Sequence, residues 1–137
     1  MTAREELVRR AVAAFNERDW PGLQGTSHPE SSLSRPVPDV GQTSYPSFNG
    51  TYRGPAEIAE ASRQVVESLG GLQVELRQAE ELGDDGLLCE YLLLIGPEAD
   101  RSAQLAWIVH RFRDGLILTN TNFSTKDAAR EAIERGA

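Results

Sequence analysis

The sequence contains only one cysteine, Cys89, and two histidines, His28 and His110, among 137 residues. A single cysteine excludes a disulfide within the chain, which favours a reducing compartment such as the cytoplasm. The cysteine and the histidines show none of the spacings typical of metal ligands, so no metal site is expected. Glycine-rich phosphate loops, a serine elbow and nucleotide-binding fingerprints are also missing, and no cofactor is expected.

Basic residues and long apolar runs are scarce as well. There are 14 Lys and Arg against 21 Asp and Glu, which gives a net charge of −7 and an isoelectric point of about 4.8. A negative surface disfavours nucleic acid and anionic membranes as partners. No apolar run approaches the roughly 20 residues that span a bilayer. The first residues, MTAREELVRR, lack the apolar core of a signal peptide. The sequence therefore predicts a soluble cytoplasmic protein.

The first half of the chain has the apolar spacing of helices. A length of 137 residues fits one domain, residues 1–137. Apolar residues recur at helical spacing over residues 3–18, and a shorter helix is expected around Leu23. Pro55 suits the first turn of a third helix. Residues 28–54 are rich in proline, serine and glycine, and predict irregular structure with one short strand near Leu33.

From residue 72 onward, the apolar period changes to two, which is typical of strands. A second segment is apolar on both faces, as in a strand that is covered on both sides. The expected strands cover residues 72–82, 87–95, 103–112 and 116–123. A capping box at residues 124–127 predicts a last short helix. This order of elements predicts an α+β fold, in which helices pack on one face of a curved antiparallel sheet.

The last expected strand, LILTNTNF, places two asparagines, Asn120 and Asn122, on one face. Asparagine is disfavoured in strands. The asparagine face therefore either meets water or lines a pocket that needs hydrogen-bonding groups. Leu116 and Leu118 share this face, which favours the inward orientation.

His110 lies in the otherwise apolar strand that precedes the asparagines. A two-residue turn would pair Val109 with Asn120 and place His110 on the opposite face. A three-residue loop over residues 113–115 would pair Ile108 with Asn120 and place His110 on the asparagine face. A histidine in a pocket can act as a general base near neutral pH. The alternative is a neutral histidine that is hydrogen-bonded across the sheet.

Several segments resemble SnoaL-like proteins of the nuclear-transport-factor-two-like superfamily, over residues 5–133. The segments that carry the resemblance are AVAAFNERDWPGL, HPE, YRGPAEI, FRDGLI and TNF. The resemblance implies a cone-shaped fold. In this fold, N-terminal helices wrap around a curved sheet, and the cone encloses an internal pocket. The HPE segment, from His28 to Glu30, is expected to close the second helix onto the sheet rather than to act in catalysis.

The resemblance also shows which catalytic groups are missing. Steroid isomerases of this fold use a tyrosine, a base before a proline and a strand carboxylate. Those positions correspond here to Ala11, Arg35 and Ile108, so isomerase chemistry of that kind is not expected. Related cyclases and epoxide hydrolases carry an aspartate where this chain has Asn122. An amide takes up no proton at neutral pH, and acid–base catalysis from that position is lost.

The residues and the resemblance together predict a pocket that binds or transforms a small, largely apolar ligand. The residues expected to contact the ligand are Asn120, Asn122, Tyr91 and Ile108. If the protein is an enzyme, a cofactor-independent cyclase, isomerase or hydrolase with His110 as its base is expected. The alternative is a non-catalytic accessory module whose pocket is plugged by side chains.

Trp107 and Val109 are expected on the outer face of the sheet. Two large apolar residues on this face predict that another chain covers it. An exposed stripe of this kind usually marks an interface. Proteins of the resembled fold often pair sheet to sheet, so a homodimer through this face is expected.

Overall fold

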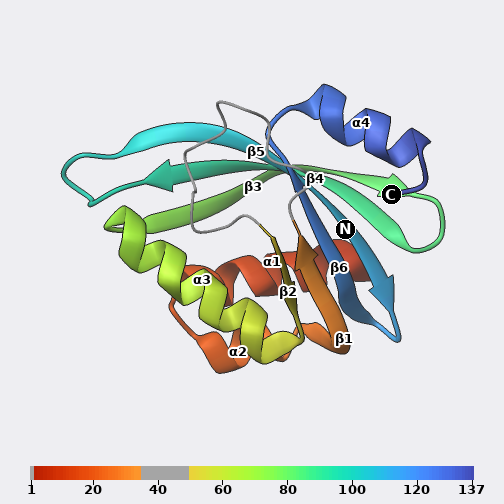
Figure 1. Cartoon of the computed structure of the whole chain (residues 1–137), viewed down its shortest axis with the longest axis horizontal. Coiled ribbons are helices and arrows are strands. Elements are labelled where there is room, and N and C mark those ends of the chain that lie inside the picture. The colour runs from red at the N-terminus through yellow and green to blue at the C-terminus, as the bar shows by residue number, and fades with distance from the viewer. Residues whose placement is uncertain (1, 35–49) are drawn as a thin grey trace.

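The computed structural model describes residues 2–34 and 50–137 (Figure 1). Its helices are α1 (Ala3–Asn16), α2 (Trp20–Gln24), α3 (Pro55–Leu69) and α4 (Lys126–Glu134). Its strands are β1 (Ser27–Ser34), β2 (Thr51–Arg53), β3 (Leu72–Leu82), β4 (Gly86–Ile95), β5 (Ser102–Arg113) and β6 (Leu116–Phe123). Within these ranges, no helix has the length and apolar character needed to cross a bilayer. Arg35 lies outside the described residues.

The strands form one sheet in the order β2-β1-β6-β5-β4-β3. Strands β3 to β6 are antiparallel neighbours, which confirms the predicted α+β fold with a curved antiparallel sheet. The parallel pairing of β1 with β6 was not predicted. The sequence of β1, SHPESSLS, has no apolar alternation that would predict a strand. Its backbone is instead paired on both sides, with β2 and with β6. The short strand expected near Leu33 is confirmed as part of β1, and the segment expected to be irregular contributes a second strand, β2, that was not predicted.

The three N-terminal helices lie together on one side of the sheet (Figure 1). Helix α1 begins at Thr2, whose side chain accepts a hydrogen bond from the backbone of Glu5. Its Leu7 and Val8 are buried against β3, β4 and β6 in the main core cluster. At its last residue, Asn16 both donates to and accepts from the backbone of Val74 in the edge strand β3, at 2.8 and 2.9 Å. Helix α1 is therefore fixed to the sheet at its end as well as along its apolar side.

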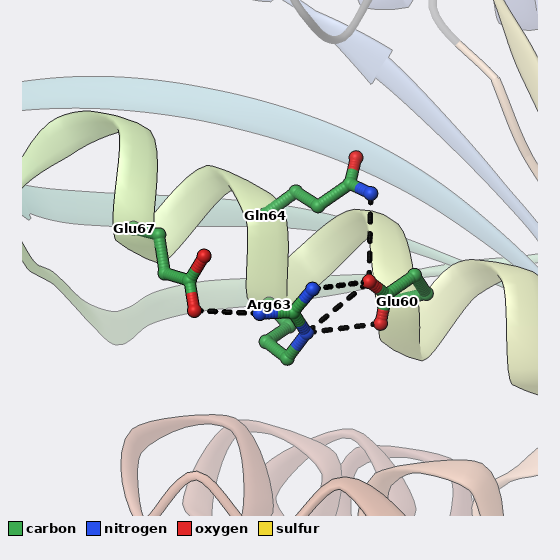
Figure 2. Close-up of polar contacts among 4 residues, drawn as sticks. All are labelled: Glu60, Arg63, Gln64 and Glu67. Atoms are coloured by element: carbon green, nitrogen blue, oxygen red, sulfur yellow. Dashed lines mark hydrogen bonds and ion pairs between the residues drawn. The ribbon is translucent and has the colours of Figure 1, made fainter.

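Helix α3 has one buried side and one exposed side. Pro55 stands at its start, and Gly70 ends it with a φ of 72°, a left-handed conformation that favours glycine. On the exposed side, Arg63 forms ion pairs with Glu60 and Glu67 at helical spacing (Figure 2). Exposed pairs of this kind contribute little to stability. They lie on the solvent side of α3, and the opposite side of this helix faces the sheet.

Helix α4 packs on the opposite face of the sheet, so the prediction that helices cover one face only is wrong (Figure 1). Ala129 of α4 is fully buried against Leu88, Val109 and Phe123. These three strand residues form a second apolar patch with Ala129. A short amphipathic helix at the end of the chain covers this patch, and it removes Val109 from the surface expected to meet a partner.

Candidate functional site

A cavity of about 230 Å³ lies between the sheet and the N-terminal helices. Its wall is mostly apolar, and includes Val8, Ala11 and Phe15 of α1, Val65 of α3, and Val74 and Ile108 of the sheet. Among the described residues, none that lines the cavity has a charged side chain. Its polar side chains include Tyr91, His110, Asn120 and Asn122. An apolar cavity with a few polar groups is the usual form of a small-molecule site.

The hairpin between β5 and β6 decides which side chains meet in the cavity. Asp114 and Gly115 form a two-residue turn, with φ values of 55° and 75°. One residue of β6, Leu118, is then left without a partner where the register shifts. Because of this bulge, His110 lies directly opposite Asn120. Neither predicted register is right, although the three-residue alternative had placed His110 on the correct face.

Asn120 connects the backbone of β1 to the imidazole of His110. Its amide Nδ2 donates to the carbonyl oxygen of Ser32 at 3.1 Å, which fixes the orientation of the amide. Its Oδ1 lies 2.8 Å from His110 Nδ1. An amide oxygen only accepts hydrogen bonds, so His110 Nδ1 must carry the proton. In the neutral imidazole, Nε2 is then an acceptor, and the hydroxyl of Tyr91 donates to it at 2.7 Å.

Cys89 lies next to Tyr91 in the interior, and it is fully buried. Burial raises the pKa of Cys89 to about 12 and raises the pKa of Tyr91 well above its usual range. Both groups therefore stay protonated at neutral pH.

Burial also governs the protonation of His110. Its side chain is 5% exposed, and burial lowers its pKa from 6.5 to about 4, against a smaller opposing effect of the hydrogen bond to Asn120. At neutral pH the imidazole is uncharged, and both of its nitrogens are engaged. The geometry is that of a neutral histidine hydrogen-bonded across the sheet.

Asn122 stands opposite Ile108, one pair further along the same two strands. Its Nδ2 donates to the carbonyl oxygen of Ser34 at 3.4 Å. Its Oδ1 has no partner among the described residues. The structure thus brings all five predicted site residues to the cavity wall. Sequence reasoning missed Ser32 and Ser34, which act through backbone carbonyls, and no side-chain pattern could have indicated them.

His28 lies outside the cavity wall. Its Nδ1 accepts from the backbone N–H of Glu30 at 3.0 Å, so Nε2 carries the proton and donates to Asp114 at 3.3 Å. This arrangement joins β1 to the turn between β5 and β6. In the described part of the chain, no three His, Cys, Asp or Glu side chains gather as metal ligands would.

Comparison with known proteins gives a family and a fold. A family model described as SnoaL-like domain matches residues 8–120. No curated protein matches the chain. TerC, crystallised with polyporic acid, is 24% identical, with 97% of this chain and 99% of TerC covered and a TM-score of 0.76. An NTF2-like protein from Burkholderia pseudomallei is 20% identical, with coverage of 96% and 97% and a TM-score of 0.74.

A further similar structure is RV0760c from Mycobacterium tuberculosis, in complex with estradiol-17beta-hemisuccinate. It is 10% identical to this chain, with 93% of this chain and 97% of that chain covered, and the TM-score is 0.72. At these identities the likeness of the structures shows the fold, which is NTF2-like.

The buried His110 should make stability depend on pH. The unfolded chain binds a proton on this side chain near pH 6.5, whereas the folded protein resists protonation down to about pH 4. Stability should therefore fall as the pH drops through this window, by about 3 kcal/mol in total from this group. A His110→Gln variant should lose that part of the slope, while His28→Gln should keep it. Urea unfolding between pH 4.5 and 7.5 measures the slopes, and equal slopes in wild type and His110→Gln would contradict the assignment.

Proposed function

Because the chain belongs to the family of SnoaL-like domains, we propose that its cavity binds a small, largely apolar and uncharged molecule. The observation that carries this proposal is the cavity of about 230 Å³ on the inner face of the sheet, whose wall holds no charged side chain within residues 2–34 and 50–137. A charged ligand would lose its hydration there without gaining an opposite charge, which is costly. An apolar ligand gains free energy by leaving water. The cavity also argues against a pocket plugged by its own side chains.

Some lining residues would make apolar contacts with the ligand, and others would orient it by hydrogen bonds. Ile108 offers an apolar surface, and Asn122 offers a hydrogen bond beside it. Tyr91, His110 and Asn120 are held by one another, so they present a fixed surface to the ligand. The ligands in the TerC and RV0760c structures, polyporic acid and estradiol-17beta-hemisuccinate, support small-molecule binding as a use of this fold.

Binding accounts for the site better than acid–base catalysis does. A general base needs a free lone pair and a pKa near the working pH. His110 Nε2 accepts the proton of Tyr91, and its pKa is about 4. To act as the base of a cyclase, isomerase or hydrolase, His110 would first have to give up the hydrogen bond from Tyr91. The proposed role of His110 is therefore to position Tyr91 and Asn120.

A change at Ala11 tests the proposal. Ala11 faces the cavity, whereas Ala13 is exposed on the same helix. Ala11→Phe should fill part of the cavity and weaken binding of an uncharged aromatic probe, 2-naphthol, by about tenfold or more. Ala13→Phe introduces the same side chain outside the cavity and should leave the affinity unchanged. Isothermal titration calorimetry measures both affinities. Equal binding by the two variants would place the probe elsewhere.

We also propose that the chain forms a homodimer through the part of the outer sheet face that α4 leaves open. Leu105 is 40% exposed there, and it is paired with Leu92 of the neighbouring strand. Trp107 is half-buried on the same face, with its indole N–H bonded to Glu90 at 3.2 Å. Val109 takes no part, because α4 covers it.

Charge placed on this open patch should separate the two chains. Leu105→Glu buries an unpaired charge in the proposed interface, which is strongly unfavourable. The variant should sediment as a single chain, whereas the wild type and a control with the same charge elsewhere, Ala13→Glu, should sediment as dimers. A wild type with the mass of one chain would exclude this interface.

A further inference from the structure

Three polar side chains of the cavity wall surround Ala106 on the inner face of the sheet. Gln104 is two residues before Ala106 on β5, and it therefore shares the same face. Asn122 of β6 is paired with Ile108. Continuing this antiparallel register by two residues places Ser124 opposite Ala106 and leaves Asn122 on the diagonal. The Cα atoms of all three residues thus lie within about 8 Å of that of Ala106. We name Gln104, Asn122 and Ser124 the polar subsite.

The polar subsite has hydrogen-bonding capacity that the protein does not use. Gln104 and Ser124 are half-buried, and their side chains have no hydrogen-bond partner within residues 2–34 and 50–137. Asn122 uses one N–H for the carbonyl oxygen of Ser34, which leaves its second N–H and its Oδ1. The subsite can therefore donate as well as accept. Because buried polar groups are normally hydrogen-bonded, water or a ligand must supply the partners.

The space above Ala106 is left open by the side chains beside it. Ala106 has only a methyl side chain, and its partner on the neighbouring strand β4 is Tyr91. The hydroxyl of Tyr91 is bonded to His110, which is four residues further along β5. The ring of Tyr91 is thus directed along the sheet and away from Ala106. A ligand group can reach the polar subsite through the space that these two residues leave.

The side of the cavity formed by α1 and β3 is apolar. The wall residues from these two elements are Val8, Ala11, Val12, Phe15, Leu72 and Val74. Ser62 of α3 also faces the cavity, but its hydroxyl donates to the carbonyl oxygen of Ile58 at 2.8 Å. A polar ligand group on this side would lose its water without gaining a partner, which is costly. The cavity therefore has one polar side, towards β5 and β6, and one apolar side.

We propose that the polar subsite binds the single polar group of an otherwise apolar ligand, such as an alcohol, a phenol or a carboxamide. The apolar body of the ligand then lies against α1 and β3. A hydroxyl or an amide can both donate and accept a hydrogen bond, as the subsite can. A ligand with a polar group at each end would bury one of them against the apolar side. This inference rests on the proposed binding function, and it adds Gln104 and Ser124 to the site beside Asn122.

Two probes of nearly equal shape test the assignment: 2-naphthol and 2-fluoronaphthalene. Only the hydroxyl of 2-naphthol can both donate and accept a hydrogen bond. A double variant, Gln104→Met with Asn122→Leu, keeps the approximate size of both side chains but removes their amides. It should lower the affinity for 2-naphthol by about tenfold, because hydrogen bonds are lost, and change the affinity for 2-fluoronaphthalene by less than about twofold. The control Ser27→Ala removes a cavity hydroxyl at the other end of β6, opposite Ile117, and should leave both affinities unchanged.

Calorimetric titrations of both probes separate failure of the inference from failure of the proposed function. If the double variant binds 2-naphthol as tightly as the wild type does, or loses affinity for both probes equally, the polar subsite does not hold the ligand's hydroxyl and the inference is wrong. The inference is also wrong if Ser27→Ala, and not the double variant, selectively weakens binding of 2-naphthol. In each of these cases, binding by the wild type still supports the proposed function. If the wild type binds neither probe, the proposed function fails and the inference fails with it.

Discussion

The hydrogen-bonding requirement of one buried imidazole governs the arrangement of the site. His110 is shielded from water, so each of its nitrogens needs a partner inside the protein. Asn120 satisfies one nitrogen and Tyr91 the other. Asn120 can do so only because its amide is held by the carbonyl oxygen of Ser32. The contact therefore depends on the parallel pairing of β1 with β6, and on the bulge at Leu118 that brings His110 opposite Asn120.

The same chain of hydrogen bonds links the fold to the proposed function. It crosses β4, β5, β6 and β1, and a buried polar group that loses its partner costs about 1–3 kcal/mol. A change of rotamer in any of these side chains would therefore cost free energy, even when the cavity is empty. A wall fixed in this way requires little rearrangement when a ligand enters, which reduces the entropy cost of binding. It also leaves His110 poorly suited to abstract a proton, since its charged form is disfavoured.

Local patterns in the sequence were sufficient to predict the helices and the central strands. Apolar periodicity indicated α1 and α3, and the alternation after residue 72 indicated β3 to β6. Asn120 and Leu118 are two residues apart in a strand, so they were expected to share the inner face, and Asn120 does line the cavity. Leu118, however, is the bulge residue. The bulge, the β1–β6 pairing and the position of α4 could not be predicted. They depend on contacts between distant segments, and on backbone carbonyls such as that of Ser32.

The tautomer of His110 is the most direct test of this account. Nitrogen-15 NMR of the imidazole at pH 7 distinguishes a protonated ring nitrogen from an unprotonated one. We expect a protonated Nδ1 and an unprotonated Nε2, because Asn120 Oδ1 can only accept and the Tyr91 hydroxyl donates. The same spectrum of an Asn120→Leu variant should lose this preference. A protonated Nε2 in the wild type, or a doubly protonated ring at pH 7, would contradict the direction of the hydrogen bonds on which the site is built.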